Sequence, residues 1–123
     1  MKALLCKEFG PPETLSYEEI EDPVLKEGHI IVDIHSASVN FPDVLMIEDK
    51  YQFKPPLPFA PGGEASGVIS EIGDGVEGFN VGDRVIASSG WGSFAEKILV
   101  DPNALTIIPD QMDHNTAAAF LMT

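Results

Sequence analysis

A glycine-rich segment is the first place in the sequence where a cofactor could bind. Residues 73–78, Gly-Asp-Gly-Val-Glu-Gly, match the G-x-G-x-x-G pattern that holds the pyrophosphate of a dinucleotide. Such a site also needs a helix that begins directly after the motif, so that its N-terminus faces the phosphates. Here residues 79–83, Phe-Asn-Val-Gly-Asp, favour a turn, and the carboxylates of Asp74 and Glu77 would repel a phosphate. We therefore interpret the segment as a loop between two strands.

Metal ligands and catalytic nucleophiles are sparse. The one cysteine and three histidines are scattered, and none of them shows the spacing of metal ligands. Cys6 lies inside a predicted strand, without the histidine and acid pattern that activates a nucleophile, so it is typical of a small buried residue. His29 and His35 fall at the start and on the more polar face of another predicted strand. We expect no metal site.

Length and charge narrow the classes of function. With 123 residues, of which 44% are hydrophobic, the chain is large enough for one globular domain with a core. A balance of 20 acidic against 7 basic residues gives a net charge of −13, which argues against nucleic acid or an anionic membrane as a partner. The single cysteine fits a reducing compartment, and the sequence shows no signal peptide or membrane span. We therefore expect a cytoplasmic protein.

The elements that must position a site are mostly short strands. Apolar or alternating runs bounded by glycine and proline predict strands at residues 2–9, 15–21, 29–39, 65–72, 83–87, 94–100 and 105–108. A short helix is expected within residues 40–51, with Pro42 in its first turn. A second helix begins at His114. This pattern predicts a mainly β fold, an antiparallel barrel or sandwich with short helices.

The second helix is expected to reach the last residue. Asp113 is a good N-cap, and the residues that follow it continue a helix to Thr123. No glycine and no polar tail closes this helix, which indicates a fragment of a longer protein. Leu121 and Met122 would then be exposed where the rest of that protein covers them.

One ordered set of residues resembles a known family. The set comprises Pro58, Pro61, Gly62, Glu64, Gly67, the run 72–76, Phe79 and the run 82–85. In this order it resembles the N-terminal catalytic domain of the medium-chain dehydrogenase/reductase superfamily, and the resemblance extends over the whole chain. It implies a GroES-like, partly open antiparallel β-barrel over residues 1–123. In that superfamily a Rossmann domain binding NAD(P) follows, and the resemblance implies that it is absent from these residues.

Two positions in this resemblance separate branches of the superfamily. Zinc-dependent members place a cysteine where Asn40 stands and a histidine where Gly63 stands, and a catalytic zinc needs three protein ligands. The chain also lacks the four-cysteine loop of those members. It is therefore similar to the zinc-independent NADPH:quinone oxidoreductases, whose loop matches Asn40, Asp43 and Tyr51. Leu45 stands where many of them have a second tyrosine.

The resemblance implies roles for individual side chains. Asn40 would hydrogen-bond a substrate carbonyl or the nicotinamide amide, or it would cap the helix that follows, and both roles stay open. Tyr51 would donate to a quinone or stack on it, or it would be a half-buried anchor. Thr123 aligns with a threonine near the nicotinamide ring. Asp43 would tie its loop down. Glu64 would hydrogen-bond near the cofactor, or its carboxylate would accept backbone N–H bonds in the glycine turn at residues 61–63, Pro-Gly-Gly.

These implications lead to one main hypothesis and one alternative. The main hypothesis is the substrate-side domain of a zinc-independent, NAD(P)H-dependent oxidoreductase that reduces quinones or enones by hydride transfer. NADPH, with NADH as the alternative, would be bound mainly by the missing domain. The full-length protein would be a homodimer, and residues 1–123 alone would be inactive. The alternative is a non-catalytic, free-standing GroES-like barrel that acts as an assembly or chaperonin-cofactor module. Its mobile loop would be residues 40–61.

Overall fold

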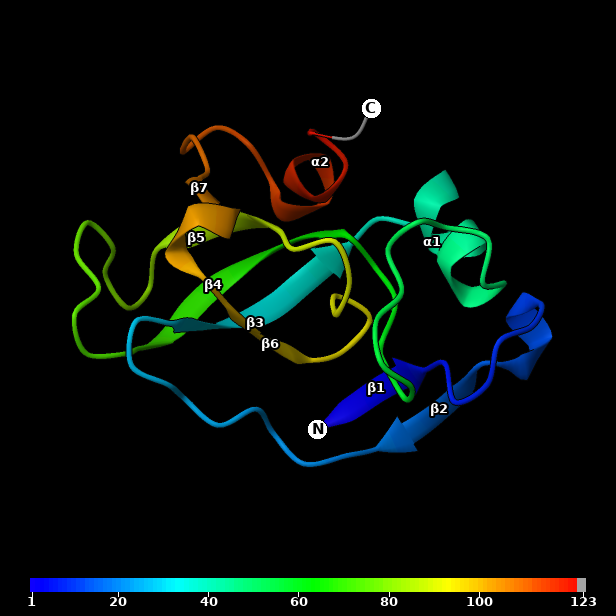
Figure 1. Ribbon diagram of the computed structural model, residues 1–123. Coiled ribbons are helices and arrows are strands. Elements are labelled where there is room, and N and C mark those ends of the chain that lie inside the picture. The colour runs from blue at the N-terminus through cyan, green and yellow to red at the C-terminus, as the bar shows by residue number, and fades with distance from the viewer. Residues whose placement is uncertain (122–123) are drawn as a thin grey trace.

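The computed structural model describes residues 1–121, and in this part of the chain the fold is mainly β (Figure 1). Two α-helices and two 3₁₀ turns connect the strands. The strands are β1 (Lys2–Leu5), β2 (Ser16–Glu19), β3 (Ile30–Ala37), β4 (Glu64–Ile72), β5 (Arg84–Ser88), β6 (Lys97–Val100) and β7 (Leu105–Ile107). The helices are α1 (Phe41–Ile47) and α2 (His114–Ala118), and the 3₁₀ turns span Pro12–Thr14 and Pro102–Ala104.

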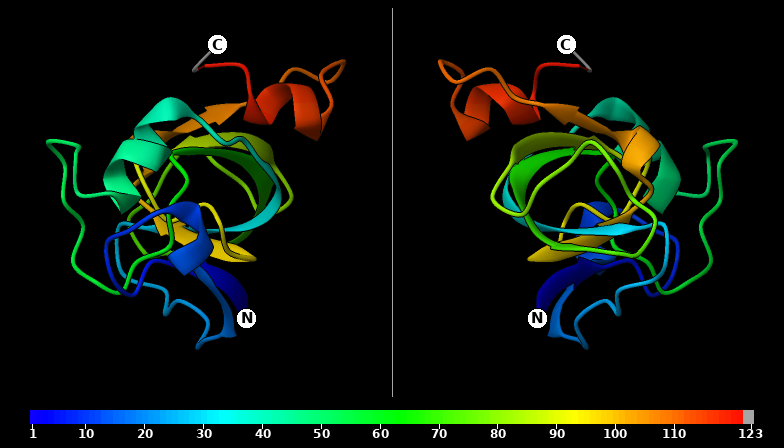
Figure 2. Two further views of the ribbon diagram at one scale, coloured as in Figure 1. Left: turned by 90° about the vertical axis from the view of Figure 1, so that its right-hand side faces the viewer. Right: turned by 90° about the vertical axis from the view of Figure 1, so that its left-hand side faces the viewer.

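The strands form two antiparallel sheets. One sheet is the β1–β2 hairpin, and the other has five strands in the order β6-β3-β4-β5-β7. The larger sheet curls strongly, so that in the end-on views its strands nearly enclose a ring (Figure 2). Its outer strands, β6 and β7, are not paired with each other, so the barrel is partly open. The predicted GroES-like, mainly β architecture is confirmed.

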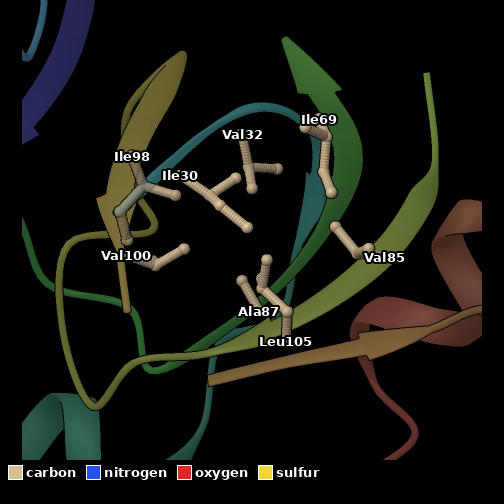
Figure 3. Close-up of a cluster of buried hydrophobic side chains, with 8 residues drawn as sticks. All are labelled: Ile30, Val32, Ile69, Val85, Ala87, Ile98, Val100 and Leu105. Atoms are coloured by element: carbon tan, nitrogen blue, oxygen red, sulfur yellow. The ribbon is translucent and has the colours of Figure 1, made fainter. Parts of the chain in front are cut away.

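The core lies inside the curl of the five-stranded sheet. Because side chains alternate along a strand, every second residue points inward, as Ile30 and Val32 do on β3. These inward side chains meet at the centre of the barrel (Figure 3). The cluster consists of Ile30, Val32, Ile69, Val85, Ala87, Ile98, Val100 and Leu105. Burying one such aliphatic side chain contributes on the order of 1.5–3 kcal/mol, so this cluster is the main source of stability.

A glycine lets the two longest strands come together. A Cβ built on Gly67 of β4 would lie 2.1 Å from the carbonyl oxygen of Asp33 on β3, which no side chain could tolerate. Close by, the pairing of β3 with β4 shifts register between Ile34 and Ser36. The glycine and the irregularity together bend β3 at the point where it leads toward α1.

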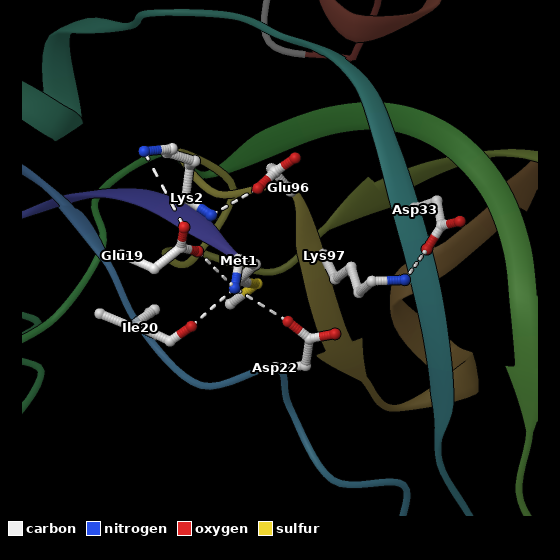
Figure 4. A network of polar contacts seen from close by, with 8 residues as sticks. All are labelled: Met1, Lys2, Glu19, Ile20, Asp22, Asp33, Glu96 and Lys97. Atoms are coloured by element: carbon white, nitrogen blue, oxygen red, sulfur yellow. Dashed lines mark hydrogen bonds and ion pairs between the residues drawn. The ribbon is translucent and has the colours of Figure 1, made fainter.

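Polar contacts fasten the N-terminal hairpin to the barrel (Figure 4). The ammonium group of Met1 donates to the Ile20 carbonyl at 2.6 Å and pairs with Glu19 and Asp22 at 2.9 and 3.0 Å. The Lys2 N–H donates to the carboxylate of Glu96, just before β6. A backbone bond from the Glu96 N–H to the Lys2 carbonyl, 3.1 Å long, completes the junction. The hairpin thus lies edge to edge with the segment that leads into β6.

The predicted elements are all present, but several are shorter than expected. β1 ends at Leu5 instead of residue 9, and α2 ends at Ala118 instead of residue 123. The prediction of one continuous C-terminal helix is therefore wrong. The N–H of Phe120 bonds to the carbonyl three residues earlier, and the next N–H, that of Leu121, turns to a side chain of β4. Residues 73–78 form the β4–β5 loop, as interpreted.

Candidate active site

A cavity of about 310 Å³ lies between α1, the loop that follows it and the loop after β5. Its volume is within the usual range for small-molecule sites, about 300–1,000 Å³. One wall is made by Pro42, Asp43, Met46, Tyr51 and Phe53. The facing wall is made by Gly63 and residues 88–91, Ser-Ser-Gly-Trp. The walls are mostly apolar, and a few hydroxyl groups are set among them.

The start of α1 positions the first wall. The Asn40 N–H donates to the carboxylate of Asp43 at 2.8 Å, and the Asp43 N–H bonds to the Asn40 carbonyl at 3.0 Å. Pro42 in the first turn suits this start, because its ring fixes a helical φ and it needs no N–H partner there. This local sequence begins the helix immediately after β3 and turns Asp43 toward the glycine turn.

Asp43 is the buried acid of the site. It is 4% exposed, and burial raises the pKa of its carboxyl group above the usual range. The backbone N–H groups of Asn40, Gly63 and Gly62 oppose this shift, because they stabilise the carboxylate. The side chain therefore connects the start of α1 with the turn before β4, which is the tethering role expected of it.

Tyr51 lines the cavity and packs into the protein at the same time. Its half-buried ring lies against a cluster that contains Cys6, Met46, Ile47 and Phe59. Within residues 1–121 the Tyr51 hydroxyl makes no hydrogen bond, so it can donate to an oxygen of a ligand. Tyr51 is thus a half-buried anchor, one of its two predicted roles, and it also lines the cavity; its contact with a quinone stays a prediction.

Asn40 lies beside the cavity and is not among the residues that line it. Its half-buried carboxamide donates from Nδ2 to the Ser38 hydroxyl at 2.8 Å. The fold therefore brings Asn40 next to Asp43, behind the first wall, and only Tyr51 of the two predicted catalytic residues reaches the cavity surface. The other predicted cofactor contact, Thr123, lies outside the described residues.

The loop after β5 supplies a wall that the sequence did not predict. The N–H groups of Ser89 and Gly90 bond to the Gly63 carbonyl at 3.0 and 3.4 Å, and the Ser89 hydroxyl donates to the Trp91 carbonyl at 2.9 Å. Trp91 meets Phe59 edge to face, with ring centroids 6.2 Å apart. The sequence shows here only a tryptophan between two glycines, which is also typical of a packing or interface residue.

Glu64 ties a different part of the fold. It is completely buried at the start of β4, and its Oε1 accepts the N–H of Leu121 at 2.8 Å. This bond joins the end of α2 to the strand that leaves the glycine turn. Glu64 therefore holds the C-terminal segment against the barrel, close to the site but outside the cavity lining.

The described residues offer no ready metal centre. No group of three or more His, Cys, Asp or Glu side chains in residues 1–121 could hold a metal ion. At Gly63, a Cβ would lie 3.3 Å from the Gly90 carbonyl oxygen, so a larger residue would need the facing loop to shift. In the same part of the chain, no helix has the length and apolar character needed to cross a membrane.

Residues 26–110 match the alcohol dehydrogenase GroES-like domain family. The chain belongs to this family. It is 38% identical to mouse quinone oxidoreductase-like protein 2 over 117 residues, which are 95% of this chain and 33% of that protein. It is 34% identical to human quinone oxidoreductase over 121 residues, 97% of this chain and 37% of that protein.

Solved structures show the same likeness. A probable oxidoreductase from Mycobacterium abscessus matches 98% of this chain, and 38% of its own, with a TM-score of 0.92 and 37% identity. The Escherichia coli quinone oxidoreductase complexed with NADPH matches 98% of this chain, and 37% of its own, with a TM-score of 0.91 and 28% identity. The chain thus spans about a third of the length of the curated relatives it matches. The predicted medium-chain dehydrogenase/reductase, quinone oxidoreductase-like family is confirmed.

Proposed function

We propose that this chain is the substrate-side domain of a zinc-independent, NAD(P)H-dependent oxidoreductase that reduces quinones or enones. The observation that carries the proposal is the cavity of about 310 Å³, with the Tyr51 hydroxyl on one wall and Trp91 on the other. Mostly apolar walls with a few hydroxyl groups suit a small ring that carries a carbonyl group. The names of the relatives support this choice of substrate class.

The chain's own residues bind and orient the substrate in this proposal. Tyr51 donates a hydrogen bond to the substrate carbonyl oxygen, while Met46 and Phe53 cover the ring and exclude water. A nicotinamide, NADPH or NADH, supplies a hydride when bound, and solvent supplies the proton that completes the reduction. Asn40 and Thr123 remain proposed contacts to the nicotinamide ring.

The pyrophosphate of the cofactor does not fit the one glycine motif of the chain. Residues 73–78 lie in a loop between two strands, and both of its acidic side chains, Asp74 and Glu77, are exposed there. We therefore place the cofactor phosphates on a Rossmann domain outside these 123 residues, and we propose that the complete protein is a homodimer. Asn40 and Gly63, at the positions of two zinc ligands, support a reaction without zinc.

Substitutions in an active chimera test the proposal. Residues 1–123 are joined to the remaining part of Escherichia coli quinone oxidoreductase, and quinone reduction is followed with NADPH. Tyr51→Phe and Asn40→Ala should each lower kcat/KM roughly tenfold or more, about 1.4 kcal/mol, with little change in thermal stability. Tyr17→Phe is the matched control, because Tyr17 is exposed on β2. Full activity in both site variants would return these residues to structural roles.

No observation favours the alternative of a free-standing assembly module. That function needs a mobile apolar loop, for which residues 40–61 were the candidate. Instead, α1 occupies part of this segment, and Met46, Ile47 and Phe59 are buried in one cluster. Asp43 further fixes the segment to the glycine turn.

A further inference from the structure

A second and larger cavity lies on the other side of the loop after β5. It has a volume of about 710 Å³ and runs between the β1–β2 hairpin, β6 and residues 58–60. Leu5 and Ile20 line it from the hairpin side, and Leu99 lines it from β6. Most of the lining is apolar. The charged residues Lys97 and Asp101 also line the cavity, and they are half-buried and exposed, respectively. The active-site proposal does not use this cavity.

The two cavities share a wall. Ser88, Ser89 and Trp91 line both of them. Phe59, which meets the Trp91 ring edge to face, lines the larger cavity and belongs to the same cluster as Tyr51. Trp91 is therefore the largest side chain in the wall that separates the cavity beside Tyr51 from the larger cavity.

The backbone behind this partition is fixed, whereas the indole is not enclosed. The Gly92 N–H bonds to the Ala60 carbonyl at 2.7 Å, and the Ser89 N–H bonds to the Gly63 carbonyl at 3.0 Å. Between these bonds Trp91 keeps 37% of its surface exposed. A ligand that reached from one cavity into the other would therefore displace the indole rather than the loop backbone.

We propose that the larger cavity receives the apolar tail of a substrate whose carbonyl-bearing ring occupies the smaller cavity. The substrate class is then a quinone with an alkyl or isoprenoid side chain. This inference rests on the proposed function, because the ring must bind beside Tyr51 for its tail to pass Trp91. The linings support it, since Tyr51 lines only the smaller cavity, whereas Leu5, Ile20 and Leu99 line only the larger one.

A fluorescence titration of the 123-residue chain tests the tail site. Trp91 is the single tryptophan, so its quenching reports on the shared wall. The probes are 2,3-dimethoxy-5-methyl-1,4-benzoquinone and the same ring with a decyl chain. The decyl quinone should bind at least tenfold more tightly, which corresponds to the burial of only about two methylene groups. Leu99→Gln and Ile20→Gln should each remove most of this advantage and leave the affinity for the tail-free quinone unchanged.

Val24→Gln is the matched control, because Val24 is 78% exposed and lies outside the lining of both cavities. Equal affinity for the two quinones would overturn the tail site and leave the proposed function standing. The tail site would also be overturned, and the proposed function left standing, if the decyl quinone still bound more tightly in both cavity variants. Its decyl chain would then bind elsewhere on the surface. If decanol quenches Trp91 saturably but neither quinone does, both this inference and the proposed function are overturned.

Discussion

Removing the carboxylate of Asp43 should clearly destabilise the fold around the site. Its buried carboxylate accepts the Asn40 N–H and faces those of Gly62 and Gly63. Asp43→Leu should lower the free energy of unfolding by about 2 kcal/mol or more, because a buried N–H without a partner costs roughly 1–3 kcal/mol. Asp43→Asn should cost much less, since its amide oxygen still accepts. Urea unfolding at neutral pH measures both.

The control for this comparison is Asp74→Leu, because Asp74 is an exposed residue of the β4–β5 loop. Its variant should unfold like the parent chain. Equal losses for Asp43→Leu and Asp43→Asn would contradict the tethering role of the acceptor oxygen.

Residue roles were predictable only where the sequence itself brings the partners together. Asp43 lies three residues after Asn40, so the tie at the start of α1 follows from local helix geometry. Tyr51 was likewise close enough to α1 to be assigned to its loop. Ser88 and Trp91 were not predictable as site residues, because they reach α1 only through the pairing of β4 with β5.

Among the elements, α2 is attached to the barrel in a way that depends on pH. The His114 ring stacks on His35 of β3, with centroids 4.3 Å apart, and its Nδ1 lies 3.1 Å from the Ser66 hydroxyl. Burial lowers the pKa of His114 below 6.5, and the nearby His35 and Arg84 lower it further, against a smaller opposing effect of Asp113. The folded state therefore disfavours protonation of this ring.

Because the pKa of His114 is lowered in the folded state, α2 should be less stably attached at acidic pH. A depressed histidine pKa contributes full stability above the unfolded value, near 6.5. As the pH falls below that value, this stability is lost until the pH has passed the lower folded-state pKa. Amide hydrogen exchange should show α2 opening more often at pH 5.5 than at pH 7.5, after correction for intrinsic exchange. His114→Gln should flatten this dependence, whereas His29→Gln, outside α2 and its contacts, should not. An unchanged dependence in His114→Gln would contradict this assignment.

Element boundaries show where sequence patterns stop being informative. The alternation in β3 predicted a strand, because its inward residues are continuous and aliphatic. The apolar run after His114 predicted a longer helix, but Glu64 on β4 binds the Leu121 N–H and competes with helix continuation. Glu64 is distant from α2 in the sequence, so the sequence pattern alone could not predict where α2 ends.

At the scale of the whole molecule, one core cluster joins all the strands of the larger sheet. The cluster around Ile30 and Val85 draws on β3 to β7, and β1 and β2 are fastened by the Met1 and Lys2 contacts. Phe120 and Leu121 are about half exposed near the end of the described chain. A chain with its own core but an apolar edge should fold alone and tend to self-associate at that edge.

The last prediction concerns cofactor binding by the chain alone. Residues 1–123 should fold with a β-rich spectrum, bind NADPH too weakly to measure at micromolar concentrations, and reduce no quinone. The reason is electrostatic and geometric: the net charge is −13, and the one glycine motif lies in a β-loop with exposed Asp74 and Glu77. Calorimetric titration with NADPH measures this, with the chimera as the control that binds. If the 123 residues bound NADPH at micromolar concentration and reduced a quinone, the cofactor site would lie inside the barrel domain. That result would contradict the proposal that a separate Rossmann domain binds the cofactor.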